Sequence, residues 1–302
     1  MSDVIDKPRI LITGGEGQLG WELANAFAPF GDVFAFDRAH LNLADPDAIR
    51  ARCREVEPAL ILNAGAYTAV DRAESEPDIA MQVNGIAPGI LAEEANRLDA
   101  PLIHYSTDYV FDGFATTPYR EDDATAPQSV YGRTKLTGEN AVVATAKNYL
   151  VFRTSWLYGN RRQNFMLTML RLARERDELR IVGDQVGAPT WVGSVSQATA
   201  RRVAATDANL LLNIPNGIYH LTAAGRTSWA SFAAAILEGV DDPARRAKRV
   251  IPITTADYPT PAKRPAFSVL ALDKISAVSG NKPPDWRTQL AACLAERKRL
   301  KL

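Results

Sequence analysis

Short apolar runs alternate with amphipathic stretches along the first half of the chain, and this pattern predicts its fold. Runs of this kind, each four or five residues long, are typical of strands buried on both faces of a parallel sheet. Helical patterns lie between them, as at 19–27 and 46–56. The alternation predicts an α/β protein with a doubly wound parallel sheet of the Rossmann type. The predicted strands lie at 9–13, 33–36, 59–63, 101–105 and 150–153.

The second half departs from this regular alternation. Its helical patterns lie at 164–176, 192–205 and 228–237, and an extended stretch rich in proline spans 252–265. We therefore expect two parts: a nucleotide-binding domain over 1–158, and a smaller C-terminal α/β domain over 159–302 that holds the substrate. The run at 217–222 predicts one more strand, which we expect to return to the first sheet.

Composition and charge narrow the functional classes. The 302 residues contain 35 basic and 35 acidic side chains, which balance. The chain therefore lacks the positive net charge that is typical of nucleic-acid binding. Apolar runs stay well below the roughly 20 residues of a membrane span, and the first residues lack an apolar signal core. We expect a cytoplasmic protein without a membrane partner. Cys53 and Cys293 are far apart in sequence and are expected to be reduced. The cysteines and histidines lack metal-ligand spacing, so no metal site is predicted.

The first predicted strand leads directly into a loop rich in glycine. Its glycines fit two spacings, Gly15-x-Gly17-x-x-Gly20 and Gly14-x-x-Gly17-x-x-Gly20. Glycine lets a backbone approach a pyrophosphate closely, and the start of the following helix offers free N–H groups to phosphate oxygens. A flexible turn is the alternative for the motif alone. Its place between a strand and a helix favours a dinucleotide site.

Two adjacent residues after the second strand favour different dinucleotides. Asp37 stands where an acidic residue binds the adenosine ribose hydroxyls, which favours NAD. Arg38 follows it and is suited to the 2′-phosphate of NADP. The sequence therefore leaves both NADPH and NADH open.

Tyr131 and Lys135 are four residues apart, which places them on one face of a helix. An ammonium near a phenol is expected to lower the pKa of the phenol from about 10. A tyrosine of this kind can exchange a proton with a carbonyl or alcohol oxygen. The pair also occurs by chance in helices. It gains weight from Thr107, a hydroxyl just after the fourth strand and at the same sheet edge as the glycine loop.

Longer motifs add a resemblance to a known family. They are Ser-Thr-Asp-Tyr-Val-Phe-Asp-Gly at 106–113, Tyr-Gly-Arg-Thr-Lys at 131–135, Arg-Thr-Ser-Trp-Leu-Tyr-Gly at 153–159 and Asp-Gln-Val-Gly-Ala-Pro-Thr at 184–190. Essentially the whole chain resembles the extended short-chain dehydrogenase/reductases, and among them the dTDP-4-dehydrorhamnose reductase family. The resemblance implies reduction of a dTDP-sugar, dTDP-4-dehydro-6-deoxy-L-mannose, to dTDP-L-rhamnose by NADPH or NADH. This is the last step in making activated rhamnose for cell-surface polysaccharide.

The resemblance also implies a role for individual residues. Tyr131 is the proton donor to the C4 oxygen, Lys135 holds the nicotinamide ribose, and Thr107 binds the reacting oxygen or the tyrosine. Asp108 and Trp156 contact the sugar together with Thr107. The expected cofactor contacts are Gly14, Gly17, Gln18, Leu19, Asp37, Arg38, Asn42, Leu43, Ala66, Tyr67, Thr68, Tyr105, Tyr131 and Lys135.

Two departures bear on assembly and on competing functions. Some members of the family form a magnesium-bridged dimer through glutamates; Glu22 matches one such position, but 191–193 carry no carboxylate. This departure from the family pattern argues against Mg²⁺, and a homodimer stays open. Another nucleotide-sugar epimerase or a dehydratase is one alternative, although Tyr109 stands where dehydratases usually carry a glutamate. A catalytically silent regulatory subunit is the other, and the presence of Tyr131 and Lys135 argues against it.

Overall fold

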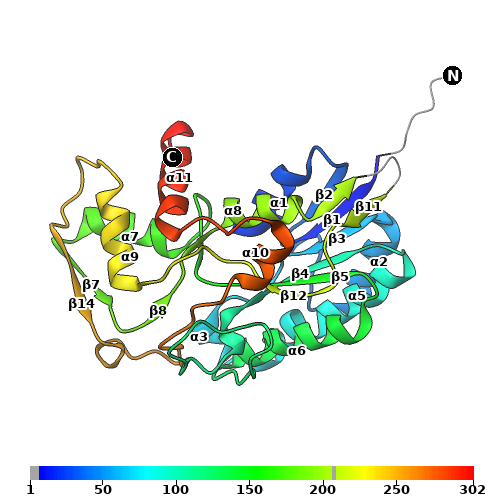
Figure 1. Cartoon of the computed structure of the whole chain (residues 1–302), viewed down its shortest axis with the longest axis horizontal. Coiled ribbons are helices and arrows are strands. Elements are labelled where there is room, and N and C mark those ends of the chain that lie inside the picture. The colour runs from blue at the N-terminus through cyan, green and yellow to red at the C-terminus, as the bar shows by residue number, and fades with distance from the viewer. Residues whose placement is uncertain (1–6, 206–208) are drawn as a thin grey trace.

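The centre of the molecule is a six-stranded sheet in the order β12-β5-β4-β3-β1-β2, with all neighbouring strands parallel. The computed structural model describes residues 7–205 and 209–302. The sheet confirms the predicted doubly wound α/β class (Figure 1). Its strands are β1 (Arg9–Thr13), β2 (Asp32–Phe36), β3 (Leu60–Asn63), β4 (Leu102–Thr107), β5 (Tyr149–Thr154) and β12 (Gly217–His220).

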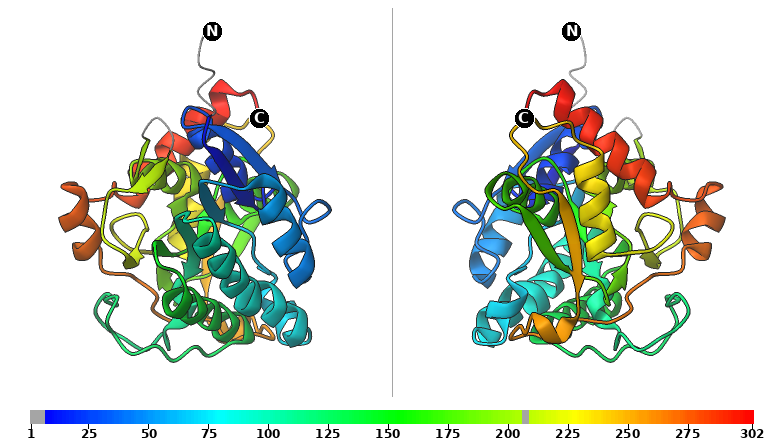
Figure 2. Two further views of the ribbon diagram at one scale, coloured as in Figure 1. Left: turned by 90° about the vertical axis from the view of Figure 1, so that its right-hand side faces the viewer. Right: turned by 90° about the vertical axis from the view of Figure 1, so that its left-hand side faces the viewer.

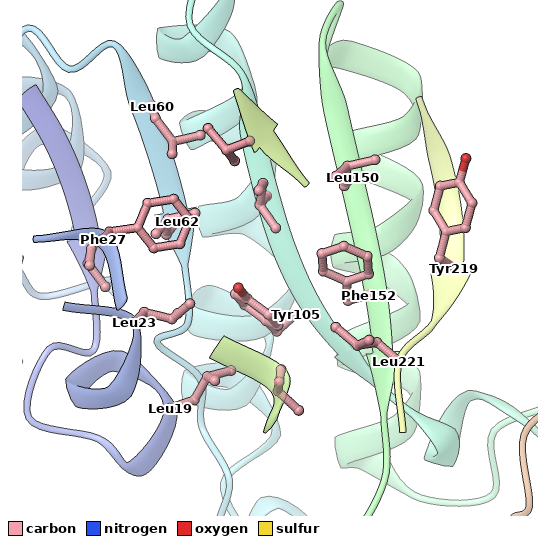
Figure 3. Packing of buried hydrophobic residues seen from close by; sticks show 14 of the residues in the cluster. Leu19, Leu23, Phe27, Leu60, Leu62, Tyr105, Leu150, Phe152, Tyr219 and Leu221 are labelled. Carbon is pink, nitrogen blue, oxygen red and sulfur yellow. The ribbon is translucent and has the colours of Figure 1, made fainter. Parts of the chain in front are cut away.

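Helices cover both faces of this sheet. On one face α1 (Gln18–Phe27) and α8 (Val192–Ala200) pack on the strands through a buried apolar cluster. Figure 3 shows Leu19, Leu23 and Phe27 of α1 lying over strand residues that include Leu62 and Tyr105. On the other face lie α2 (Pro46–Val56), α5 (Ala87–Arg97) and α6 (Val130–Thr145), which run side by side (Figure 2). Both faces of β1, β3, β4 and β5 are therefore buried, as their apolar runs require, whereas the edge strand β2 leaves Phe34 exposed.

The second helix forms where its local sequence signals place it. Asp45 caps it, because its carboxylate accepts hydrogen bonds from the N–H groups of Asp47 (3.0 Å) and Ala48 (3.1 Å). Pro46 occupies the first turn, where its missing N–H costs nothing. Ile49 and Cys53 then face the core. The observed bounds match the prediction for 46–56.

The helical stretch after β3 is divided into four segments. It consists of α3 (Val70–Ala73), α4 (Pro77–Met81), the π-helical segment η1 (Gln82–Ile86) and α5. The break at Pro77 follows from proline chemistry. The π-helical turn was not predicted; such turns are frequent at functional sites, and this one carries the buried Asn84.

A second apolar core lies away from the sheet. Here β7 (Glu178–Val182) pairs in parallel with β14 (Arg249–Ile253), at the opposite end of the molecule from α2 and α5 (Figure 1). The helices α7 (Phe165–Glu175), α9 (Trp229–Glu238) and α11 (Trp286–Arg299) enclose this core. The remaining elements are η2 (Asp108–Val110), β6 (Leu157–Tyr158), β8 (Val186–Gly187), β9 (Thr190–Trp191), β10 (Val203–Ala205), β11 (Leu210–Leu212), β13 (Thr227–Ser228), η3 (Thr255–Asp257) and α10 (Asp273–Ser279).

The second half of the chain contributes to both cores. Strand β12 pairs with β5, with Gly217 opposite Leu150, where the return strand was expected. The helix predicted over 192–205 was too long: it ends at Ala200, because 203–205 pair as β10 with β11. The division of the chain at residue 158 stays a prediction. Within residues 7–205 and 209–302, no helix combines the length and apolar character needed to cross a membrane.

A buried ion pair joins α6 to β5. The Arg153 guanidinium donates to the Glu139 carboxylate at 2.8–3.2 Å, and the two side chains are 3% and 1% exposed. We expect Arg153→Met to lower the free energy of unfolding by about 3–5 kcal/mol, because it leaves a buried carboxylate unpaired. Urea denaturation measures this loss. Adding Glu139→Leu to Arg153→Met should recover most of the lost free energy of unfolding. An Arg153→Met variant as stable as the parent protein would contradict this account.

Candidate active site

The glycine loop follows β1 at the carboxyl edge of the sheet and leads into α1. Gly14 has φ +67°, a left-handed conformation that favours glycine. Its carbonyl accepts a hydrogen bond from Gly17 N–H at 2.8 Å. A Cβ atom at Gly20 would overlap the same Gly14 carbonyl. The loop and α1 can therefore lie this close only with glycine at positions 14 and 20.

The start of α1 has the properties of a phosphate site. Gly17 occupies the N-cap position and provides no side-chain cap to the first N–H groups of the helix. The Gln18 Oε1 atom beside it is buried and has no hydrogen-bond partner within the described part of the chain. Free helix N–H groups fit a pyrophosphate, and an unpaired amide oxygen fits a ribose or amide donor. These residues thus fit a dinucleotide.

We expect Gly20→Ala to weaken NADPH binding at least about tenfold, because the loop must move away from the added methyl group. Gly89→Ala in α5 is the matched control, since its Cβ would meet only the Ala141 Cβ, at 3.2 Å. Fluorescence titration with NADPH measures both variants. Equal affinity of Gly20→Ala and the parent protein would contradict the role of the loop.

The residues expected at the adenosine end follow β2. The Asp37 Oδ1 atom accepts from the His40 backbone N–H at 2.9 Å and lies 2.6 Å from His40 Nδ1. These hydrogen bonds lower the pKa of Asp37, so it is a carboxylate. Arg38 is exposed. Asn42 closes a turn by accepting from Ala44 N–H at 3.1 Å, and Leu43 is buried in the core.

Asn84 fixes the loop that follows β3. Its amide oxygen accepts from Tyr67 N–H at 2.8 Å, and its amide nitrogen donates to the Tyr67 carbonyl at 3.1 Å. The same nitrogen donates to the Thr134 hydroxyl of α6 at 3.2 Å. The loop with Ala66, Tyr67 and Thr68 is thereby joined to the helix that carries Tyr131. Asn84 is not among the predicted site residues; the signal for it in the sequence is a polar residue inside a helical stretch.

Tyr131 lies in the first turn of α6, close to the end of β4. Ser129 caps this helix by accepting from Gly132 N–H at 3.1 Å. A side chain at position 132 would overlap the Tyr109 carbonyl, so glycine permits the close approach. The rings of Tyr131 and Tyr109 meet edge to face, with 5.6 Å between their centroids. The Tyr131 side chain also forms a hydrogen bond with the Thr107 side chain, so the structure brings these two residues together.

The pKa of Tyr131 differs from the expectation. Burial raises it to about 12; a hydrogen bond with Thr107 acts in the opposite direction, and the Asp108 charge raises it further. The predicted lowering by Lys135 is absent, because the Lys135 Nζ atom donates to the Tyr105 carbonyl at 2.6 Å. A raised pKa keeps the phenol protonated at neutral pH, which a proton donor requires.

Asp108 is buried beside Thr107 and accepts several hydrogen bonds. The Thr107 hydroxyl donates to its Oδ1 atom at 3.0 Å, and the Ser155 hydroxyl donates to its Oδ2 atom at 2.9 Å. Burial raises the pKa of Asp108 to about 6, while these bonds and one from Ser268 oppose the shift. Ser155 was missed by the sequence analysis, although it directly follows the fifth strand.

Trp156 has φ +48° and stacks on Trp229, with 3.5 Å between the ring centroids and 5° between the planes. Gly187 lies against the same indole, where a Cβ would meet Trp156. Trp229 was not predicted as part of the site. The Tyr105 ring packs in the sheet core (Figure 3), and its hydroxyl donates to the Thr199 hydroxyl at 2.9 Å. Only the Tyr105 carbonyl contacts Lys135.

Comparison with known proteins places this geometry in a family. Residues 8–299 match the family model described as RmlD substrate binding domain. The dTDP-4-dehydrorhamnose reductase of Burkholderia thailandensis is 44% identical over 293 residues, which cover 95% of this chain and 98% of the relative. The chain belongs to the dTDP-4-dehydrorhamnose reductase family.

Solved structures of this reductase family agree with the fold. The Clostridium acetobutylicum structure has 35% identity and a TM-score of 0.86, and the match covers 97% of this chain and all of that one (100%). The Bacillus anthracis reductase, solved in complex with NADP, has 32% identity and a TM-score of 0.86 and covers 96% of this chain and 99% of that one.

Glu22, which the sequence analysis considered as a metal ligand, lies in α1. Burial and the nearby Glu296 charge raise the pKa of Glu22 to about 7, and Arg161 opposes them. Among the described residues, no three His, Cys, Asp or Glu side chains are grouped to hold a metal ion. Cys53 and Cys293 are both buried free thiols.

Proposed function

We propose that the protein reduces the C4 ketone of dTDP-4-dehydro-6-deoxy-L-mannose to give dTDP-L-rhamnose, using NADPH. The observation that carries this proposal is the position of Tyr131. Its phenol lies beside Thr107 at the carboxyl edge of the sheet, where the glycine loop also lies, and it belongs to a helix anchored to the loop after β3. The choice of a dTDP-sugar as the substrate is supported by membership of the reductase family.

The residues of the glycine loop are suited to hold the cofactor. Gln18 and Leu19 begin α1 and offer backbone N–H groups to the dinucleotide, and Gln18 adds an unpaired amide oxygen. Gly14 and Gly17 form the tight turn that lets the cofactor approach the backbone. NADPH supplies the hydride that reduces C4. We favour NADPH over NADH because Asp37 Oδ1 is already bonded to His40 and Arg38 is exposed, and because the Bacillus anthracis relative was solved with NADP.

The protein's own residues supply the proton and the orientation. Tyr131 gives its phenolic proton to the developing C4 alkoxide, and Thr107 bonds the same oxygen or the tyrosine. Lys135 lies one turn along α6 and holds the nicotinamide ribose. Asp108 accepts from sugar hydroxyls, and the Trp156 indole, fixed by Trp229, packs on the sugar. Each role is a proposal that rests on these positions.

One assay separates this function from the alternatives. Purified protein is mixed with NADPH and the dTDP-4-keto sugar, and the loss of NADPH absorbance is compared with the amount of dTDP-L-rhamnose formed. A reductase consumes one NADPH for each product molecule. An epimerase or a dehydratase would convert the sugar without net NADPH loss, and a silent subunit would do neither.

A further inference from the structure

A row of buried polar side chains crosses the sheet beneath the glycine loop. Thr13 of β1 stands opposite Asn63 of β3, and Asn63 stands opposite His104 of β4. The Thr13 hydroxyl donates to Asn63 Oδ1 at 2.7 Å, and Asn63 Nδ2 lies 2.9 Å from His104 Nδ1. The three side chains are 0%, 1% and 1% exposed, in an otherwise apolar sheet face. We call Thr13, Asn63 and His104 the polar row.

The polar row joins the cofactor loop to Lys135. At one end, Gly65 N–H donates to the Thr13 hydroxyl at 2.9 Å, and Gly65 lies against Gly14. At the other end, His104 Nε2 lies 3.4 Å from Lys135 Nζ. The Lys135 side chain is 2% exposed. Buried polar groups are costly unless each is hydrogen-bonded, so the row needs a partner for every hydrogen.

The directions of these hydrogen bonds depend on the charge of Lys135. With Asn63 Nδ2 facing His104, the imidazole carries its proton on Nε2 and points it at Lys135, which only a neutral amine can accept. An ammonium has donors only. An ammonium at Lys135 therefore requires His104 to accept at Nε2 and to carry its proton on Nδ1. Asn63 must then turn its amide oxygen toward the imidazole ring. His104 can therefore form a hydrogen bond with Lys135 in either charge state of the lysine.

Burial favours such an exchange at Lys135. It lowers the pKa of Lys135 to about 8, and the Glu139 charge acts in the opposite direction. His104 itself stays neutral, because burial and the Lys135 charge hold its pKa well below 6.5. Besides His104, the charged and titratable residues near Lys135 are Tyr131 and Glu139 on its own helix and Tyr105 of β4, whose carbonyl it contacts. Arg153 of β5 pairs with Glu139, and Asp108 of η2 acts on Tyr131.

We propose that His104 is a positioning residue for Lys135: its tautomer changes as Lys135 gains or loses a proton, and Asn63 and Thr13 adjust the row to match. Lys135 then keeps a hydrogen-bond partner in both charge states next to the proposed proton donor. This inference rests on the proposed function for its catalytic value, but the tautomer exchange itself does not depend on turnover.

The test is a ¹⁵N NMR titration of the full chain, whose three histidines keep the spectrum simple. We expect the His104 ring to change from the Nδ1–H to the Nε2–H tautomer as the pH rises through the Lys135 titration, without becoming cationic at mildly acidic pH. His220 is the internal control, since its Nδ1 lies 3.1 Å from the Ala271 carbonyl and outside the row. A His104 tautomer that stays constant through the Lys135 titration would overturn the proposal.

Asn63→Asp sharpens the test. A carboxylate cannot donate, so His104 should keep its proton on Nδ1 at every pH, and the Lys135 titration should move up by about one pH unit or more. The alkaline limit of kcat should move with it. Unchanged Lys135 and His104 titrations, with an unchanged His220 signal to prove folding, would refute the coupling.

Thr13→Val provides a second route if Asn63→Asp does not fold. It removes the hydroxyl that fixes the Asn63 amide, so the Nδ1–H tautomer should gain population at alkaline pH; an unaltered tautomer balance would count against the row. If the protein shows the tautomer exchange but does not reduce the dTDP-sugar, the proposed function is refuted and the proposal for the polar row stands.

Discussion

Tyr131→Phe is expected to reduce kcat by roughly a hundred- to ten-thousand-fold, the range typical of losing a general acid. The variant removes one hydroxyl and keeps the ring, which meets Tyr109 edge to face. Stability and NADPH affinity should therefore stay close to those of the parent protein. Steady-state kinetics with NADPH and the dTDP-4-keto sugar, together with a fluorescence titration of NADPH, measure both quantities.

The matched control is Tyr149→Phe. Tyr149 begins β5 and so lies at the amino end of the sheet, away from the glycine loop. Its substitution should leave kcat unchanged. Near-normal turnover of Tyr131→Phe, or an equal loss in both variants, would remove Tyr131 from the role of proton donor.

Lys135→Met is expected to lower both kcat and the affinity for NADPH. The change keeps a long side chain but removes the amine that donates to the Tyr105 carbonyl. Losing one hydrogen bond from a charged group to the ribose should weaken NADPH binding by about ten- to a hundredfold. The rate should fall as well, because the ribose then no longer holds the nicotinamide in place.

Lys147→Met serves as the control for this variant, since Lys147 is exposed just beyond the end of α6. Comparing NADPH dissociation constants and kcat separates binding from chemistry. An unchanged dissociation constant in Lys135→Met would contradict the ribose role and leave Lys135 as a structural residue only.

Local patterns were enough to predict most of the first sheet. The strands of the sheet are short apolar runs, and α2 has a cap, a proline at its start and an apolar face. The helix predicted over 192–205 came out too long because the pairing of β10 with β11 depends on residues later in the chain. The π-helical turn with Asn84 also depends on tertiary contacts, those with Tyr67 and Thr134.

The site was predicted in part. The motifs indicated Thr107 and Tyr131, and the structure places them together. The pKa of Tyr131 was predicted in the wrong direction, because sequence spacing does not reveal that Lys135 points toward Tyr105 and His104. The polar row was not predicted either, since its members are 50 and 41 residues apart and meet only through strand register.

The central claim is hydride transfer to C4 of the sugar, and deuterium transfer tests it most directly. The protein is incubated with the dTDP-4-keto sugar and NADPH that carries deuterium at the transferable position of the nicotinamide, and the product is examined by proton NMR. The account predicts dTDP-L-rhamnose with deuterium at C4, and at least about a hundredfold less of this product with Tyr131→Phe over the same time. Product without deuterium at C4, or consumption of the sugar without oxidation of NADPH, would contradict it.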